Sequence, residues 1–363
     1  MTLANDMPAQ PTVVDLLEHW IGLDASPVGV AAIDRAVRER MKATGITEPM
    51  AYATRAWADA SERDLLVEEV IVAESWFFRD PQVFEFVTDF AVTRAALPDR
   101  SPVRLLSAPA AAGEEPYSLV MSLFDAGLAA NQFEVDAVDI SRRTLARAEG
   151  GRYSVNAFRN ADLGFRDRWF HQDGGQSVIA PQIRRQVRFA SGNLIDAAFA
   201  AGRGPYDVIF CRNLLIYLTP AARRQVEQQL DRLLTADGLL VLGAAEPPIM
   251  KGDWIPAGTA SLFALRRGIH ARPVTTKTSV RGPAPAPQPT PIRHAPAEVR
   301  PEKPIEGATN GQASLESVLA EADRLANAGQ LADALAWCER NRPLLAPSPQ
   351  LFFLMGMLHQ SAG

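Results

Sequence analysis

The stretch VRLLSAPAAAGEEPYSLV, residues Val103–Val120, decides the fold of this chain. Its first residues are mostly apolar, as in a buried strand; a run of small residues then ends at Gly113, and Pro116 opens an amphipathic segment. This order of strand, glycine turn and helix predicts an open α/β sheet. In such sheets a nucleotide-like ligand lies beyond the carboxyl ends of the strands, so we expect the turn with Gly113 to border a binding site.

The next segment narrows the choice of ligand. Residues Glu134–Ile140 predict a second strand with Asp139 at its end, where a carboxylate can accept both hydroxyls of a ribose. The turn lacks the G-x-G-x-x-G spacing of pyrophosphate sites, and Glu114 and Glu115 would repel phosphate. We therefore expect an adenosine ligand without phosphates and with a positive charge, properties that S-adenosylmethionine combines.

Composition argues against several classes of function. The 363 residues carry a net charge of −5 with a pI near 5.7, and no Lys/Arg-rich tract points to a nucleic-acid partner. The five histidines are scattered without ligand spacing, so no metal is expected. Cys211 and Cys338 lie in separate segments, as in reduced cytosolic proteins. Without a long apolar run or a signal sequence, the chain is expected to be soluble and cytoplasmic, with no direct membrane insertion.

Residues 12 to about 75 predict a small helical unit. One of its runs has an apolar side formed by Ile33, Val37 and Met41. The opposite side carries Arg35, Arg38 and Lys42. This basic side is either an ordinary solvated helix face or a dock for an acidic partner helix.

The connection AESWFFRDP, residues Ala73–Pro81, precedes a helix that Asp80 and Pro81 are suited to begin. An aromatic-rich connection with one arginine usually packs and forms a salt bridge. Because this one comes shortly before the first strand, it is also placed to fold over the site.

Beyond the second strand, residues 153–185 predict an inserted hairpin subdomain. Strands follow again after this insertion. The strand Tyr206–Asn213 would place Arg212 and Asn213 at the expected binding site, and Tyr217 follows there after a short turn. The other expected strands lie at residues 103–108, 134–140, 187–193, 238–243 and 261–265. Six strands with intervening helices predict a three-layer α/β domain.

The last part of the chain has a different composition. Residues 269–312 predict an extended linker, since nine prolines between Pro273 and Pro304 leave no segment able to form a core. Residues 313–363 show the helical periodicity and the glycine and proline pattern of a tetratricopeptide repeat. Fewer than two units are present, which suggests a truncated array or a marginally stable tail. A repeat also suggests a second protein partner.

Taken together, the motifs resemble a known family. ESWFFRDP, SAPAAAGEEPYS, AVDIS, GNL and FCRNLLIYL occur in the order typical of the chemotaxis-receptor glutamate methyltransferases. The resemblance covers residues 12–268 and implies a Rossmann-like class I S-adenosylmethionine-dependent methyltransferase. The implied parts are an all-α N-terminal domain (1–85), the methyltransferase domain (86–268) and a small β-subdomain inserted in it (152–186).

The resemblance also implies a reaction and roles for single residues. The reaction is methyl esterification of glutamates in the cytoplasmic helical domain of a chemosensory receptor, with S-adenosylhomocysteine as the product. Tyr217 would lie beside the transferred methyl group, and Arg79 matches the arginine of the family's motif. Together with Gly113 of the turn, the cofactor ligands would be Ser75, Arg79, Glu114, Glu115, Asp139, Asn193, Leu194, Arg212 and Asn213. Ala73, Trp76 and Ala110–Ala112 depart from the family's usual residues.

The chemistry is consistent with this reading. A glutamate, with a pKa of about 4.3, is already a carboxylate at neutral pH, so methyl transfer from a sulfonium needs no general base. The site must hold oxygen, methyl and sulfur in line, and we take Tyr217 and Arg79 as the residues that do so. Structural alternatives are a core aromatic for Tyr217 and a salt-bridge partner for Arg79.

The leading hypothesis is a protein-glutamate O-methyltransferase that serves signal adaptation and is recruited to membrane receptor arrays. The alternative is a catalytically weak cofactor-binding scaffold that recruits signalling partners through its repeats. Methylation of nucleic acids or small molecules is poorly supported, because no Asn/Asp-Pro-Pro-Tyr/Phe string follows the strand that ends at Asn213 and no basic footprint for phosphates exists.

Overall fold

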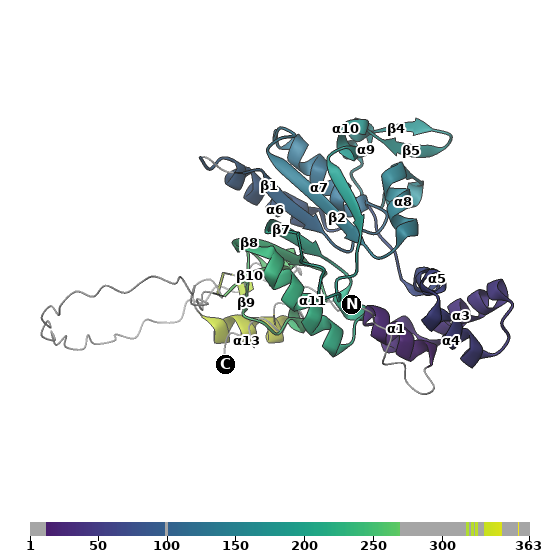
Figure 1. The fold of residues 1–363 in the computed structure, drawn as a ribbon. Helices are drawn as coiled ribbons and strands as arrows, with labels where there is room; N and C mark the ends of the chain where they lie inside the picture. The colour runs from purple at the N-terminus through teal and green to yellow at the C-terminus, as the bar shows by residue number, and fades with distance from the viewer. Residues whose placement is uncertain are drawn as a thin grey trace, which may run out of the picture.

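The computed structural model describes residues 12–98, 101–268, 317–318, 321–322, 324–325, 330–342 and 355. The predicted linker, residues 269–312, lies outside the described residues, as does most of the predicted repeat at 313–363. Figure 1 shows a group of N-terminal helices at one end of a larger part that is built around a sheet. We call these parts the helical domain and the sheet domain.

The helical domain has its own core. Its helices are α1 (Val13–Ile21), α2 (Ala25–Val28), α3 (Val30–Thr44), α4 (Pro49–Ala58) and α5 (Ala60–Val70). Thr12 and Asp15 form a capping box at the start of α1, and Asp59 caps α5. The buried Glu62 of α5 accepts hydrogen bonds from Arg40 of α3 and from Tyr52 of α4, which ties the three helices together.

The sheet domain confirms the predicted α/β class. Its main sheet has the strand order β6-β2-β1-β7-β8-β10-β9. The strands are β1 (Val103–Ser107), β2 (Phe133–Asp139), β6 (Val187–Ser191), β7 (Tyr206–Cys211), β8 (Leu234–Leu242), β9 (Trp254–Pro256) and β10 (Ala264–Arg267). Each of the six predicted strands overlaps an observed strand, and β9 is an additional edge strand. The strand expected at residues 261–265 forms only from Ala264 on, because residues 260–262 make a 3-10 turn. β6, β2, β1, β7 and β8 are parallel, whereas β10 runs antiparallel to β8 and to β9.

The strands are buried on both faces. Alternate residues of β1 show this, since Val103 and Leu105 join one core and Leu106 joins the other. The first core is covered by α6 (Pro81–Ala95) and α7 (Glu114–Asp125), and the second by α11 (Pro220–Leu233). The expected domain boundary at residue 85 falls inside α6. Because Phe84, Val87 and Ala91 of this helix pack into the sheet core, α6 belongs to the sheet domain as a whole.

The predicted insertion is a separate small sheet. It contains β3 (Arg152–Tyr153), β4 (Phe170–Asp173) and β5 (Gln176–Ile179), together with the short helices α9 (Gly164–Trp169) and α10 (Pro181–Arg184). Phe77 of the aromatic connection is fully buried against it, with ring centroids 4.7 Å from Tyr153, 5.1 Å from Phe170 and 5.2 Å from Phe158. The connection is thereby fixed between the insertion and the sheet domain.

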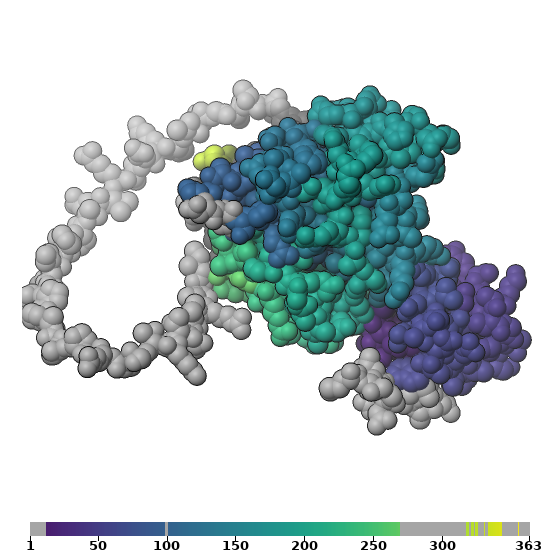
Figure 2. Space-filling model, turned by 45° about the horizontal axis from the view of Figure 1, so that its top comes forward, coloured from purple at the N-terminus to yellow at the C-terminus, as the bar shows by residue number. Residues whose placement is uncertain are grey.

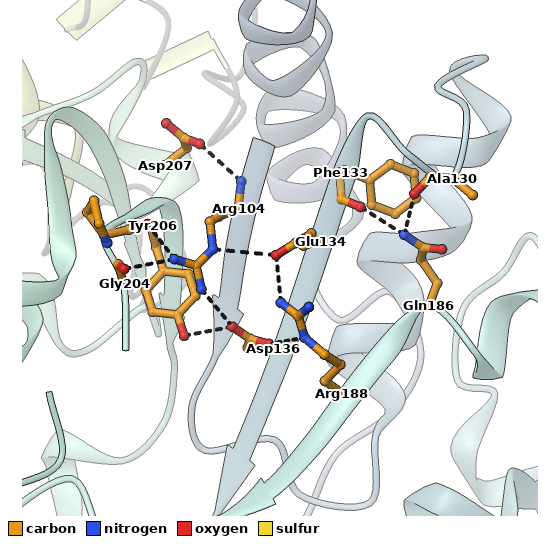
Figure 3. Close-up of polar contacts among 11 residues, drawn as sticks. Arg104, Ala130, Phe133, Glu134, Asp136, Gln186, Arg188, Gly204, Tyr206 and Asp207 are labelled. Atoms are coloured by element: carbon orange, nitrogen blue, oxygen red, sulfur yellow. Dashed lines mark hydrogen bonds and ion pairs between the residues drawn. The ribbon is translucent and has the colours of Figure 1, made fainter. Parts of the chain in front are cut away.

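A polar network covers the sheet face beside β6 (Figure 3). The described connection between β6 and β7, residues 192–205, consists of turns, so no helix shields this face. Arg188 contacts Glu134 at 2.7 Å and Asp136 at 2.8 Å, and Asp136 also accepts a hydrogen bond from the Tyr206 hydroxyl. These contacts satisfy charges that the strands present to solvent.

Part of the C-terminal segment packs on the sheet domain. Ala334 and Cys338 of α13 (Leu331–Asn341) share a buried cluster with Ala260 and Phe263. Cys211 and Cys338 are both buried. Among the helices that the structure describes, none is long and apolar enough to cross a membrane. Whether the C-terminal segment is a tetratricopeptide repeat stays a prediction.

Candidate functional site

A pocket lies where the carboxyl ends of β1, β2 and β7 face the helical domain. Figure 2 shows the helical domain, in purple, as a lobe against the sheet domain. Nine predicted site residues line the pocket: Ser75, Arg79, Glu115, Asp139, Asn193, Leu194, Arg212, Asn213 and Tyr217. The helical domain and the connection after it supply an apolar part of the wall, which includes Ile21, Leu23 and Val70.

Asp139 ends β2 with its carboxylate held on both oxygens. Oδ2 accepts the backbone N–H of Ala111 in the small-residue turn at 2.8 Å, and Oδ1 accepts that of Ser141 at 2.9 Å. Burial raises the pKa of Asp139, and these two backbone hydrogen bonds oppose that shift. Each oxygen keeps acceptor capacity for a further donor, as a ribose with two hydroxyls requires.

The buried guanidinium of Arg212 lies at the end of β7. It forms ion pairs with Asp80 and Glu115, and Nη1 also donates to the backbone oxygen of Arg79 at 3.0 Å. Glu115 in turn accepts a hydrogen bond from Ser107 at 2.8 Å. Burial raises the pKa of Glu115, while Arg212 and Ser107 favour its charged form. Asp80 is the N-cap residue of α6, but its side chain forms no capping hydrogen bond, because it is paired with Arg212.

Of the five buried side-chain polar atoms that lack a hydrogen-bond partner among the described residues, two belong to predicted site residues. They are Oε2 of Glu114 and Nε of Arg212. Buried polar groups are nearly always satisfied, and Arg212 lines the pocket, so its Nε favours a ligand that carries an acceptor. The amino-acid end of S-adenosylmethionine has an ammonium and a carboxylate, and the residues present therefore fit this cofactor.

Gly113 and Glu114 are not among the residues that line the pocket. Gly113 has a φ of 91°, and a Cβ there would lie 2.8 Å from that of Ala148 in α8 (Arg142–Gly150). The glycine is needed for a left-handed turn and for close packing of α8. Glu114 is buried behind the lining residue Ser75, whose hydroxyl favours its charged form, although burial raises the pKa of Glu114 overall.

Tyr217 and Asn193 connect the pocket to the helical domain. The backbone oxygen of Tyr217 accepts the N–H of Asp24 at 2.8 Å, and Leu218 forms an antiparallel bridge with Leu23. The side-chain amide of Asn193 donates to the backbone oxygen of Trp20 at 2.8 Å. This amide group of Asn193 is therefore engaged in holding the end of α1 beside the pocket.

Comparisons with known proteins agree with this geometry. The family model described as "CheR methyltransferase, SAM binding domain" matches residues 73–254. The chain belongs to the CheR methyltransferase family. This membership confirms the family predicted from the motifs and establishes a class I fold and an S-adenosylmethionine-binding domain.

Individual relatives extend the likeness beyond this domain. The protein of Pseudomonas aeruginosa named "Probable biofilm formation methyltransferase WspC" is 40% identical, and the alignment covers 96% of this chain and 86% of that protein. WspC of Pseudomonas putida is 39% identical, with 96% and 85% covered. A chemotaxis protein methyltransferase of Salmonella typhimurium is 30% identical over 59% of this chain and 74% of its own length.

Sequence reasoning missed Glu246 in this CheR methyltransferase domain. It follows β8, is fully buried, and accepts the backbone N–H groups of Gly243, Leu215 and Asn213 at 2.6, 2.7 and 2.8 Å. Burial raises its pKa, and the three backbone donors oppose that shift. Asn213 has a φ of 59°, so the carboxylate holds a strained turn that presents Asn213 and Tyr217 to the pocket. A single glutamate among Ala and Pro residues gives no pattern from which this role follows.

The aromatic connection forms the rim of the pocket. The guanidinium of Arg79 lies 4.4 Å from the ring centroid of Trp76, and that of Arg159 from the insertion lies 4.7 Å from it. Arg159 also pairs with Glu74 at 2.6 Å. Among the described residues, no carboxylate forms an ion pair with Arg79, whereas burial and the nearby Arg212 lower its pKa. Arg79 is thus a pocket-lining cation that can meet an incoming anion.

The described residues contain no cluster of three or more His, Cys, Asp or Glu suited to holding a metal ion. Arg35, Arg38 and Lys42 are all exposed on α3.

Proposed function

We propose that this protein transfers the methyl group of S-adenosylmethionine to glutamate side chains of a chemosensory receptor, and that the resulting methyl esters serve signal adaptation. The coarser part, a methyltransferase of the CheR family, follows from the comparisons. The observation that carries the finer part is the guanidinium of Arg79 in the pocket wall, which has no carboxylate partner among the described residues.

The proposed chemistry divides the pocket into two ends. The cofactor supplies a methyl group that its sulfonium makes electrophilic. Asp139 would hold the ribose hydroxyls, and Glu115 with Arg212 would hold the amino-acid end. Arg79 would orient the carboxylate of the receptor glutamate, and Tyr217 would lie at the point of transfer. Because that carboxylate is already ionised at neutral pH, none of these residues has to remove a proton.

We further propose that α3 docks the receptor. Arg35, Arg38 and Lys42 are exposed on it, and none of them forms an ion pair within the described residues. The other side of α3 is fixed by the bond between Arg40 and Glu62. A receptor segment that presents glutamates for methylation would be acidic, and a rigid basic face complements its charge. The insertion is held by contacts with the connection and ends in a hairpin with the short turn Gly174–Gly175, which favours recognition without a receptor tail peptide.

The names of the Pseudomonas relatives favour a receptor of a system that controls biofilm formation. Such a receptor would present its helical domain in the cytoplasm, where this protein would act without inserting into the membrane. The C-terminal segment would bind a second signalling protein.

Label transfer tests the proposal. The protein is incubated with S-adenosyl-[methyl-³H]methionine and cytoplasmic fragments of the receptors from the same organism. We expect labelled receptor from which mild base releases the label as methanol, since esters are base-labile and methylated amines are not. Cofactor binding by calorimetry without label on any receptor would instead support the scaffold alternative.

A further inference from the structure

The polar contacts between the two domains concentrate at the cofactor pocket. On one side, the segment after α1 binds the backbone of Tyr217 and the amide of Asn193. On the other side, α5 of the helical domain meets the first turn of α8, directly after the strand that ends in Asp139. The second contact involves Glu68, to which sequence reasoning gave no role.

Both carboxylate oxygens of Glu68 accept hydrogen bonds from residues at the start of α8. Oε2 accepts the hydroxyl of Ser141 at 2.5 Å, and Oε1 accepts the backbone N–H of Arg143 at 3.1 Å. The first N–H groups of a helix lack partners within the helix, and a negative charge there also interacts favourably with the helix dipole. The Glu68 side chain is 12% exposed, so little water competes for these bonds.

Ser141 links this carboxylate to Asp139. Its backbone N–H donates to Oδ1 of Asp139 at 2.9 Å, while its fully buried side chain donates to Glu68 and accepts the N–H of Thr144. The position of Ser141 is therefore set by two carboxylates at once. A shift of Ser141 would rotate the Asp139 carboxylate, because one of that carboxylate's two backbone donors would move.

We infer that Glu68 is a positioning residue for the cofactor site: through Ser141 it fixes the carboxylate of Asp139 that would hold the ribose. The helical domain thereby takes part in cofactor binding and does not serve receptor docking alone. This inference rests on the assignment of Asp139 as the ribose ligand.

The neighbouring Glu69 offers a matched control. It lies on the same helix and forms an ion pair with the Arg143 side chain at 3.1 Å, but no hydrogen bond to Ser141 or to the backbone of α8 is present. It is 40% exposed, so its pair with Arg143 contributes little. Glu69→Ala removes a carboxylate from the same interface and leaves the contact with Ser141 in place.

The test measures the affinity of the full chain for S-adenosylhomocysteine by calorimetry. Glu68→Ala is expected to weaken binding roughly five- to twentyfold, the range of a lost helix cap. Glu68→Gln keeps an oxygen for the Ser141 hydroxyl but loses the charge, so we expect a two- to fivefold loss. Glu69→Ala should stay within twofold of the parent. Thermal melting without cofactor shows whether each variant is folded.

Comparing the affinities of two ligands distinguishes a positioning role of Glu68 from a general loss of structure in the pocket. For an analogue of S-adenosylhomocysteine that lacks the ribose 2′-hydroxyl, the penalty of Glu68→Ala should shrink, because less of that ligand's affinity depends on Asp139. Equal penalties for both ligands, or equal affinities of Glu68→Ala and the parent, would overturn the inference. If Glu68→Ala does not fold, parent-like affinity of Glu68→Gln overturns it. Parent-like affinity of Asp139→Ala would instead refute the ribose assignment itself.

Discussion

Replacing Glu246 by alanine should show how strongly one buried carboxylate supports the pocket. Its two oxygens accept three backbone N–H groups, those of Gly243, Leu215 and Asn213, at 2.6–2.8 Å. All three donors lie in the segments that follow β7 and β8. In the Ala variant they would lose their acceptor at a place that is closed to water, since Glu246 has no exposed surface.

The magnitude follows from the number of donors. Each buried N–H group that loses its partner costs about 1–3 kcal/mol. The total for three such groups is smaller than the sum of the three costs, because the surrounding structure relaxes in part. We therefore expect Glu246→Ala to lower the free energy of unfolding by about 3–5 kcal/mol. Glu246→Gln can turn only one oxygen toward these donors, so its –NH₂ must face at least one N–H, and a loss of about 1–3 kcal/mol is expected.

Urea unfolding followed by circular dichroism measures both losses. Glu227 provides the control, because it also accepts three N–H groups, from Lys251, Gly252 and the Trp254 ring, but is partly exposed to water. Water can replace it there, so Glu227→Ala should cost under about 1.5 kcal/mol. A loss for Glu246→Ala no larger than for Glu227→Ala would refute the reasoning.

Three further predictions concern binding. Asp139→Ala should weaken S-adenosylmethionine binding by about 1.5–3 kcal/mol in calorimetry, because two ribose hydroxyls lose a charged acceptor, and unchanged affinity would contradict that role. Replacing Arg35, Arg38 and Lys42 by Glu should raise the KM for the receptor fragment about tenfold at low salt and less at high salt, while the affinity for the cofactor stays the same. A KM equal to that of the parent would refute docking through α3. Burial raises the pKa of Asp139 above 3.8 and that of Glu115 above 4.5, so protonation of these carboxylates should begin to lower cofactor affinity at a pH above these values. Constant affinity down to pH 4.5 would contradict this.

The fold was largely predictable because its strands carry strong local signals. Val103–Ser107 and Tyr206–Cys211 are continuous or nearly continuous apolar runs, as expected of strands buried on both faces. β9 was missed because Trp254–Pro256 is short and contains proline, a residue that disfavours strands except at a sheet edge. The domain boundary expected at residue 85 falls within α6, because the sequence does not show that this helix packs into the core of the sheet domain.

The position of a residue in the pocket wall was predictable where a residue type and a strand end coincide, as for Asp139 and Arg212. It was not predictable where a role depends on contacts between distant segments. Glu246 contacts residues 31 and 33 positions away, and Glu68 contacts residues 73 and 75 positions away. Gly113 illustrates the reverse case, since the turn was recognised but its glycine packs against α8 and does not line the pocket.

The most direct test of the account is to identify the modified atom on the receptor. A receptor cytoplasmic fragment is incubated with S-adenosylmethionine and either the parent protein or its Asp139→Ala variant, and tryptic peptides are sequenced by tandem mass spectrometry at acidic pH. The account predicts methyl groups on glutamate side chains, at much lower occupancy with the variant. Methylation confined to other residue types, or none with a protein that binds the cofactor, would contradict it.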